Sequence, residues 1–563
     1  MNIKRVVYHL ATARLTRRGE MMEAWDVIVI GDGPAAMRAA IESAGSGAST
    51  LLSSPFSLGA GNTCAMDGLA ASIMEADSKS HSNDTIQAGA FLCDQDIVAK
   101  RVANAVSQVN LLERWGVIFR RNTKGTPHAV TAFGHSKPRV TGAGDATVKE
   151  TQQVLEEQCI RQGVVRRGNQ LPLELVHRNQ SICGAIILDM TTGQLHPLQA
   201  KTVIIADGGF EEAWNGSNYS GGLGMDLALR AGISLRDMEF IVRSPLAISG
   251  TDIILPAGIL NDGASLHSAD GADLEITPDA DMHYVVEKMQ QTPNPVLDAR
   301  GLKGQWWNGI SRQISQRLGV EIDKQTLAIS CKEVSTIGGI PVDENGRVVT
   351  EKWSRWFTGL YAAGDAACSG MHGAGMIVGN RLLDALAGGA AAGKHAGEWS
   401  QGANFSGRGE LEAVIGAAEA ELDLLFIEQE GDVMRSGSIT ADLTQVMDSS
   451  MGFEREEKGL SAGLEKLLQL SDTAGQLYCD DQSRLYNDNL RQILYLKAMI
   501  RLSIAATRSA LARKESRGLH QRSDYPQTDN EQLHHTLVDK EGNLSSLAIR
   551  KGSSGTWLIA PNA

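Results

Sequence analysis

The 563-residue sequence contains only seven cysteines, and no two of them form a Cys-x-x-Cys pair. That spacing is the usual ligand arrangement of zinc ribbons and of many iron–sulfur clusters, so we expect no metal site in this chain. The cysteines are odd in number and scattered, which favours reduced thiols and a cytoplasmic protein over a disulfide-bonded secreted one.

Long apolar runs and excess positive charge are also lacking. No apolar stretch approaches the ~18–20 residues that span a bilayer, so we expect no direct membrane insertion. The formal net charge of −13 argues against a nucleic-acid partner. Residues 1–23 are basic but lack the apolar core of a secretion signal. We interpret them as a flexible extension, or as residues upstream of a true start at Met21 or Met22.

Glycine is abundant, with 60 residues against 14 prolines, and the stretch 25–54 uses it in an informative way. An apolar strand over 27–30 is followed by a G-x-G-x-x-A turn, an Ala-rich helical segment and a second short strand. Gly31 lets the strand turn, Gly33 lets backbone approach a pyrophosphate, and Ala36 allows close packing of the helix. The helix N-terminus offers N–H groups to the phosphates. This pattern predicts a βαβ dinucleotide-binding unit.

Further segments suggest how the rest of the chain is organised. Residues 94–115 have helical spacing of apolar residues, and 171–206 predict a meander ending in a buried strand before Asp207. A later strand ends in Gly364-Asp365, where a carboxylate can accept from a ribityl hydroxyl. The helix predicted from residue 380 is rich in Gly and Ala and can pack closely against a sheet or a cofactor.

With these pieces in order, the chain resembles the flavoprotein subunits of the succinate dehydrogenase/fumarate reductase family, which includes L-aspartate oxidase. Four stretches carry the resemblance: residues 26–36, the loop Gly61-Asn62-Thr63 with Asp67-Gly68, residues 359–384 with His372-Gly373-Ala374, and the E-S-R-G-x-H-x-R-x-D-x-P ending over 513–526. The resemblance covers about residues 24 to 545.

The resemblance implies an α/β fold with a Rossmann-like, glutathione-reductase-like FAD-binding domain. An α+β capping domain interrupts it, and a helical C-terminal domain follows. We expect the FAD-binding domain over 24–240 and 335–400, the capping domain over 241–334, the helical domain over 410–545 and a tail over 546–563.

The resemblance also implies FAD as the cofactor. The positions expected to bind it are Gly31, Gly33, Ala36, Ser53, Gly61, Asn62, Thr63, Gly68, Asp207, Gly364, Asp365, Asn380 and Leu383. Respiratory members attach FAD covalently to a His in the loop where this chain has Asn62. We therefore expect non-covalent FAD, whose potential is less suited to oxidising succinate.

The dicarboxylate site of the family is largely replaced. Its His after the M-E-F stretch falls at Ser244, its R-G-E-G-G has no counterpart around residues 255–261, and its proton-shuttling Arg falls near Trp307. A further His falls at Val334 and the substrate Arg at Met376, whereas His372 persists. Because a carboxylate left without its Arg partner costs several kcal/mol, we expect succinate and fumarate to be poor substrates.

Three residues are candidates for the catalytic roles. Arg243, next to the lost His, could supply a cation or a proton, or could form a surface salt bridge. His372 could touch the substrate or a flavin carbonyl. Arg312, in the capping segment, could act on the substrate or be solvated. Trp306-Trp307 could stack on a planar substrate or pack in the core.

The sequence thus favours an FAD-dependent oxidoreductase that transfers hydride between flavin N5 and an organic substrate other than a plain C4 dicarboxylate. Its electrons would pass to or from a separate iron–sulfur subunit, through which it could lie peripheral to a membrane, or to oxygen. Two alternatives remain: an electron-relay or structural flavoprotein subunit with a degenerate pocket, and a genuine fumarate reductase or succinate dehydrogenase.

Overall fold

A computed structural model describes residues 14–15, 21–59, 68–71, 75–216, 221–303, 305–350, 355–427 and 435–561. At its centre lies the predicted βαβ unit. Strand β2 (Met21–Ile30) leads through Gly31 into helix α2 (Pro34–Gly45), and β3 (Thr50–Ser53) pairs parallel to β2. Gly31 has φ +121°, and a Cβ there would lie 2.2 Å from the carbonyl oxygen of Ala206, so only glycine fits this turn.

The unit belongs to a sheet of nine described strands. Its main order is β17-β18-β9-β10-β2-β3-β7, with β1 beside β2 and β8 beside β9. Strands β18, β10, β2, β3 and β7 run parallel where they pair, whereas β8, β9 and β10 form the predicted antiparallel meander. The other strands are β1 (Arg14–Leu15), β7 (Val165–Arg167), β8 (Gln170–Arg178), β9 (Ser181–Asp189), β10 (Gln194–Ile205), β17 (Arg347–Thr350) and β18 (Arg355–Ala362).

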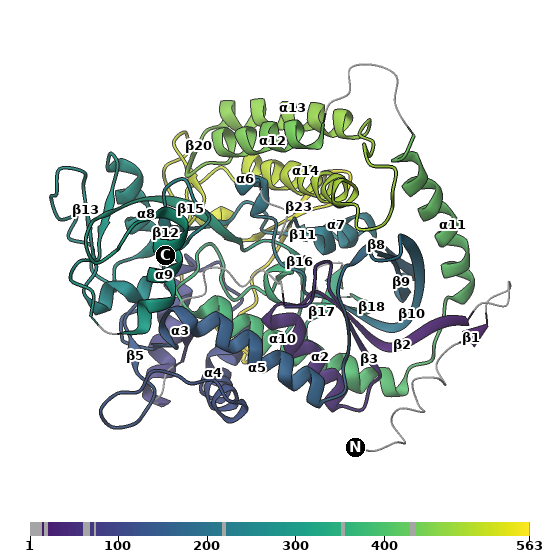
Figure 1. The fold of residues 1–563 in the computed structure, drawn as a ribbon, viewed down its shortest axis with the longest axis horizontal. Coiled ribbons are helices and arrows are strands. Elements are labelled where there is room, and N and C mark those ends of the chain that lie inside the picture. Colours follow the sequence, from purple (N-terminus) through teal and green to yellow (C-terminus); the bar gives the residue numbers. More distant parts are fainter. Residues whose placement is uncertain are drawn as a thin grey trace.

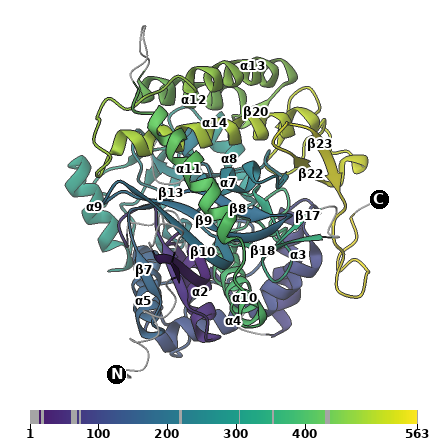
Figure 2. The same cartoon turned by 90° about the vertical axis from the view of Figure 1, so that its right-hand side faces the viewer.

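Helices cover both faces of this sheet (Figures 1 and 2). Alternate residues of β2 point to opposite faces, so Ile28 and Ile30 join one core while Val27 and Val29 join the other. The first core includes residues of α7 (Leu223–Arg230), α12 (Ser436–Ser450), α13 (Glu457–Ala474) and α14 (Asp488–Ala512). The second includes residues of α2, α4 (Gln95–Trp115), α5 (Thr147–Arg161) and α10 (Asn380–Gly402).

Helices α2 and α10 pack without intervening side chains. A Cβ at Gly389 would lie 2.4 Å from the Ala35 carbonyl oxygen, and one at Gly393 would lie 2.1 Å from that of Ala39. The small residues predicted for this helix therefore let it approach the backbone of the dinucleotide-binding helix. The described helix extends to Gly402, beyond the predicted end near residue 396.

A second sheet forms the part of the molecule at the left of Figure 1. Its order is β12-β15-β14-β13, with α8 and α9 packed in the same region. Their bounds are β12 (Ile241–Ile248), β13 (Ser265–His267), α8 (Met282–Gln291), β14 (Val296–Asp298), α9 (Asn308–Leu318) and β15 (Leu327–Thr336). This mixed unit occupies the segment expected to be the capping domain, whose limits of 241 and 334 stay predictions.

The C-terminal segment is helical and then turns to short strands. The E-S-R-G ending follows α14 and forms a fully buried ionic cluster. Arg513 Nε lies 2.7 Å from Glu239 Oε1, Arg513 Nη1 lies 2.9 Å from Glu515 Oε1, and Arg517 Nε lies 2.8 Å from Glu515 Oε1. This cluster ties the end of α14 to the segment before β12.

The remaining described elements are short or peripheral. They are α3 (Glu75–Ala88), α6 (Glu212–Asn215) and α11 (Arg408–Leu424), with β4 (Leu69–Ala70), β5 (Ala129–Val130), β6 (Val140–Thr141), β11 (Leu235–Arg236), β16 (Ile340–Pro341), β19 (Ala367–Cys368), β20 (Glu454–Arg455), β21 (Gln521–Arg522), β22 (His535–Val538) and β23 (Leu544–Leu547). Among all described helices, none combines the length and the hydropathy needed to cross a bilayer.

Candidate active site

Two adjoining cavities lie where the main sheet meets the second sheet. The first, here called the nucleotide cavity, has a volume of about 600 Å³. Its wall contains the residues that follow β2, β3, β10 and β18, which is the carboxyl end of the parallel strands. It is lined by Gly31, Asp32, Gly33, Pro34, Ala35, Pro55, Phe56, Ala206, Asp207, Gly208, Gly364, Asp365, Arg381 and Ala385.

The nucleotide cavity has the features of a site for a phosphate-bearing cofactor. Helix α2 begins at Pro34 directly after Gly33, so its unpaired N–H groups face this cavity. A Cβ at Gly33 would meet no atom within 4 Å, which leaves space beside the backbone. Two buried polar atoms, Ser53 Oγ and Asp207 Oδ1, have no hydrogen-bond partner among the described residues. These groups fit a ligand that supplies phosphate oxygens and hydroxyls.

Two of the three carboxylates in this wall, Asp207 and Asp365, differ in their surroundings. Asp207 Oδ2 accepts a hydrogen bond from the Gly224 N–H at 2.8 Å, and burial raises the pKa of Asp207 to about 6. Asp365 Oδ2 accepts from Arg381 Nε at 2.7 Å and from Ser335 Oγ at 3.2 Å. Asp365 therefore stays tied to a cation, whereas one oxygen of Asp207 is buried without a hydrogen-bond partner among the described residues.

The other positions expected to bind the cofactor are spread over several surroundings. Ala36 and Leu383 are buried in the core that contains α2 and α10. The Asn380 side chain is bonded to His81 Nε2 at 2.8 Å and to Thr85 Oγ1 at 2.9 Å. Gly68 lines the second cavity. Gly61, Asn62 and Thr63 lie outside the described residues.

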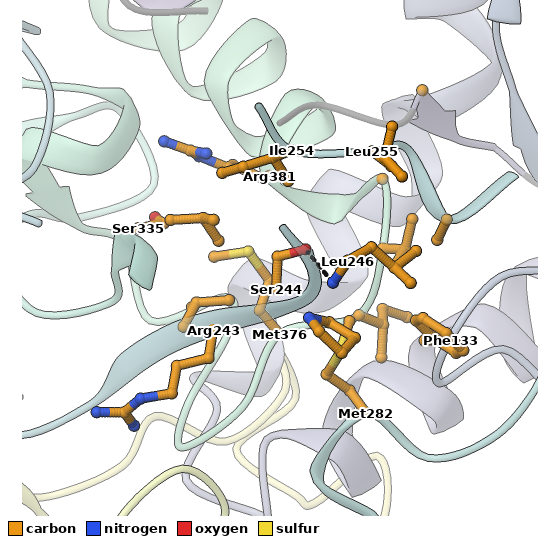
Figure 3. A pocket seen from close by; sticks show the side chains of 18 of the residues that line it. Phe133, Arg243, Ser244, Leu246, Ile254, Leu255, Met282, Ser335, Met376 and Arg381 are labelled. Carbon is orange, nitrogen blue, oxygen red and sulfur yellow. Dashed lines mark hydrogen bonds between the residues drawn. The ribbon is translucent and has the colours of Figure 1, made fainter. Parts of the chain in front are cut away.

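The second cavity, here called the apolar cavity, has a volume of about 650 Å³ and shares Arg381 with the first. Its side chains come from β12 and β15 of the second sheet, from the loop after β12, from the segment before α10 and from the start of α10 (Figure 3). Those lining it are Gly68, Phe133, Val242, Arg243, Ser244, Pro245, Leu246, Ile254, Leu255, Ala257, Met282, Val334, Ser335, Met376, Ile377, Val378, Gly379, Arg381 and Leu382. Most are hydrocarbon or thioether side chains.

The structure brings together the positions where the sequence departs from the dicarboxylate pattern. Ser244, Leu255, Val334 and Met376 come from separate segments, and all four line the apolar cavity. Trp307 does not line it; the Trp307 indole is buried and its Nε1–H donates to Asp262 Oδ2 at 2.8 Å. Trp307 therefore belongs to the core of the second sheet.

Arg243 lines the apolar cavity, but its guanidinium points away from the cavity centre in Figure 3. Arg243 Nε donates to Glu333 Oε1 at 2.7 Å, and Nη2 donates to the Met451 carbonyl oxygen at 2.9 Å. The side chain is only 3% exposed. These contacts give Arg243 a structural part between β12, β15 and the segment after α12, and its catalytic role stays a prediction.

His372 and Arg312 line neither of these two cavities. The His372 imidazole is buried with Nε2 3.6 Å from Asp384 Oδ2, and burial lowers the pKa of His372 although Asp384 opposes that shift. Arg312 is exposed on α9. The structure thus does not bring the three candidate catalytic residues together.

Three residues of this region are absent from the candidates predicted from sequence: Arg381, which lines both cavities, and Ser335 and Glu211, which lie near it. Glu211 Oε1 lies 3.9 Å from Arg381 Nη2, and burial raises the pKa of Glu211 to about 8. The position of Arg381 one residue after Asn380, at the start of a helix already expected to border the cofactor, was the signal that could have revealed it.

Known proteins match this chain along most of its length. A family model for an FAD binding domain matches residues 26–382, and one for the fumarate reductase flavoprotein C-terminal region matches 440–557. The fumarate reductase flavoprotein subunit of Mycobacterium tuberculosis (strain ATCC 25618 / H37Rv) is 30% identical, with 92% of this chain and 95% of the relative covered. A chain of Escherichia coli quinol fumarate reductase superposes with a TM-score of 0.87 at 25% identity, covering 96% of this chain and 99% of that chain.

Proposed function

The chain belongs to the family of fumarate reductase and succinate dehydrogenase flavoprotein subunits, and from this premise we propose that it acts on an organic substrate other than a plain C4 dicarboxylate. As a member it is an FAD-dependent oxidoreductase. FAD, when bound, exchanges a hydride with the substrate through its flavin ring. The proposal concerns the chemical class of the substrate in that exchange.

The nucleotide cavity supports FAD binding through the chain's own groups. The N–H groups at the start of α2 and the glycine turn before it would hold the pyrophosphate, while Ser53 and Asp207 would accept or donate hydrogen bonds to hydroxyl groups. With Asn62 in place of the family's attachment His, we propose that FAD is bound without a covalent link. Acid precipitation of the purified protein should then leave all flavin in the supernatant.

The observation that carries the substrate proposal is the lining of the apolar cavity. Two carboxylates brought into a site need cations or several N–H donors, because ionised groups lose their hydration on burial. The described lining offers Val334 and Met376 at two positions where the family has a His and an Arg. A dicarboxylate would leave charge uncompensated there.

A steady-state assay tests this proposal. Reduced viologen would donate electrons to the FAD-loaded protein in the presence of millimolar fumarate, and viologen oxidation would be followed. We expect a rate no greater than that of protein without fumarate. Sustained fumarate reduction would refute the proposal and favour a genuine fumarate reductase.

We further propose that a separate iron–sulfur subunit exchanges electrons with the flavin, and that any membrane association is peripheral and runs through such partners. Support comes from the family and from the relatives' names, which call them flavoprotein subunits. Isolation of the tagged chain from its native cells, followed by iron and acid-labile sulfide analysis, tests this. A flavin-containing preparation that turns over without co-purified iron would argue against it.

A further inference from the structure

The apolar cavity has two chemically different sides. Ser335 and Arg381 lie on one side in Figure 3, and both hydrogen-bond to Asp365 Oδ2. The opposite side carries Phe133 and Leu255, with Leu246 and the Ser244 hydroxyl between the two sides. A ligand that fills this space would meet polar groups at one end and hydrocarbon over the rest.

Both cations of the described lining already have a carboxylate partner. Arg243 Nε lies 2.7 Å from Glu333 Oε1, and Arg381 Nε lies 2.7 Å from Asp365 Oδ2. Each pair is shielded from water, since the side-chain exposures are 3% and 15% for the first pair and 11% and 14% for the second. The two pairs therefore add no net positive charge to the cavity.

Glu211, a titratable group beside Arg381, does not change this balance in favour of an anion. Glu211 lies 3.9 Å from Arg381, and its pKa is raised to about 8 by burial, so it is largely neutral at pH 7 and negative above pH 8. The residues 60–67, which precede Gly68 in the sequence, include no Lys, Arg or His. A bound carboxylate would lose its hydration without gaining an uncompensated cation.

A neutral oxygen acceptor has no such requirement, because one or two hydrogen-bond donors satisfy a carbonyl group. Ser244 Oγ accepts from the Leu246 N–H at 3.3 Å, which leaves its own O–H hydrogen to donate. The hydroxyl lies in the middle of the lining and points towards Leu246, away from the Arg243 guanidinium (Figure 3).

From these contacts we infer that the substrate is a neutral, mostly apolar molecule with a single carbonyl group, which accepts a hydrogen bond from Ser244. This inference rests on the proposed function and narrows it to one substrate class. If the carbon β to a conjugated carbonyl group received a hydride from bound reduced flavin, the same donor would stabilise the charge that develops on the carbonyl oxygen, and a proton from water at the α carbon would complete the reduction. Ser244 thus becomes a specificity-determining residue at the position where the family carries a His.

Three probes that differ in charge test the inference. They are the methyl ketone 4-phenyl-3-buten-2-one, the monocarboxylate trans-cinnamate, which has nearly the same shape, and the dicarboxylate fumarate. Each would be titrated into the oxidised FAD-loaded protein, and the perturbation of the flavin absorbance and the shift in melting temperature would be recorded. We expect the ketone to bind at least tenfold more tightly than cinnamate.

Two substitutions and one control variant, Met376→Leu, extend the test. Ser244→Ala should weaken ketone binding about tenfold, since it removes the hydrogen-bond donor to the carbonyl group. Met376→Arg adds a cation to the lining, so this variant should bind cinnamate more tightly than the ketone. Met376→Leu adds no charge and should still bind the ketone more tightly. Flavin content and melting temperature identify a variant that has failed to fold. If a Met376 variant fails in this way, the comparison of Ser244→Ala with the wild type tests the inference alone.

The possible outcomes separate this inference from the proposal on which it rests. Cinnamate binding as tightly as the ketone, or no response to either compound, overturns the neutral-carbonyl assignment. If cinnamate binds as tightly as the ketone and fumarate does not bind, the neutral-carbonyl assignment is wrong but the proposed function still holds. Tight binding of fumarate overturns both.

Discussion

At the scale of single residues, the hydrogen-bond partners of Arg243 indicate a structural role for its side chain. Its position beside the missing His suggests a catalytic cation, yet its guanidinium is held by Glu333 and by the carbonyl of Met451. The guanidinium itself points away from the cavity centre in Figure 3. The side chain thereby connects the second sheet to the C-terminal helices.

We predict that Arg243→Met destabilises the protein by about 3 kcal/mol, because it leaves the mostly buried Glu333 carboxylate without a counter-charge. Adding Glu333→Gln should recover most of that loss. Urea unfolding of the two single variants and the double variant measures the coupling. A catalytic Arg243 would instead show unchanged stability and a turnover reduced a hundredfold or more.

Glu211 gives a prediction about pH. Burial raises its pKa from 4.5 in the unfolded chain to about 8, so folding favours its protonated form. The stability that this preference contributes is complete below pH 4.5 and is lost as the pH rises to about 8.

Glu211→Gln should remove that dependence, so that its melting temperature falls less than that of the wild type between pH 5 and pH 8. Each pKa unit corresponds to about 1.4 kcal/mol, which makes the total effect a few kcal/mol. The matched change Glu465→Gln, at an exposed position of α13, should leave the profile unaltered. Parallel curves for wild type and Glu211→Gln would contradict the prediction.

The sequence pointed to single residues wherever the local backbone geometry at a strand end alone restricts which residue type fits. Gly31, Gly33, Asp207, Gly364 and Asp365 are local to strand ends, and the structure places all five in the wall of one cavity. Their contact with FAD stays a prediction. Arg381 and Glu211 lie far apart in the chain and meet only through folding, so no local pattern could reveal their proximity.

At the scale of elements, the contact between α2 and α10 determines how close the helix after the glycine turn lies to its neighbour. Gly389 and Gly393 remove every Cβ from the side of α10 that faces Ala35 and Ala39. The backbone of α10 therefore supports α2 directly, and α2 presents its N-terminus to the nucleotide cavity.

Gly393→Ala should push the two helices apart, because the new Cβ would lie 2.1 Å from the Ala39 carbonyl oxygen. We expect a loss of about 2 kcal/mol in stability and a lower FAD content of the purified protein. Gly402→Ala, at the end of the same helix, would meet no atom within 4 Å and serves as the control. Equal FAD content in both variants would refute this account of the contact.

Helices and strands with regularly spaced apolar residues were predictable from the sequence. Strands that form only by pairing with a segment far away in the chain were not. The segments 27–30, 94–115 and 171–206 carry their own signals and form β2, α4 and the β8–β10 meander. Strand β11 instead pairs with β22, about three hundred residues later, and β20 pairs with β21. Two-residue strands of this kind have no periodicity, so only tertiary contacts define them.

At the scale of the whole molecule, the apolar cavity lies where separately encoded parts meet. The second sheet contributes Ser244 and Val334, and the segment leading into α10 contributes Met376. The buried cluster of Arg513, Glu239 and Glu515 holds the C-terminal segment against the start of the second sheet. The fold class that the resemblance implied is confirmed, whereas the pairing of the cavity's cations with carboxylates could be found only in the folded chain.

The central claim is that a flavin site of this family here serves a cavity unsuited to C4 dicarboxylates. Stopped-flow mixing of the dithionite-reduced, FAD-loaded protein with excess substrate tests it most directly, with flavin absorbance as the readout. We predict that millimolar fumarate leaves the flavin reduced for minutes, whereas 4-phenyl-3-buten-2-one reoxidises it. Reoxidation by fumarate within seconds would contradict the account, and inertness towards every compound would favour an electron-relay subunit instead.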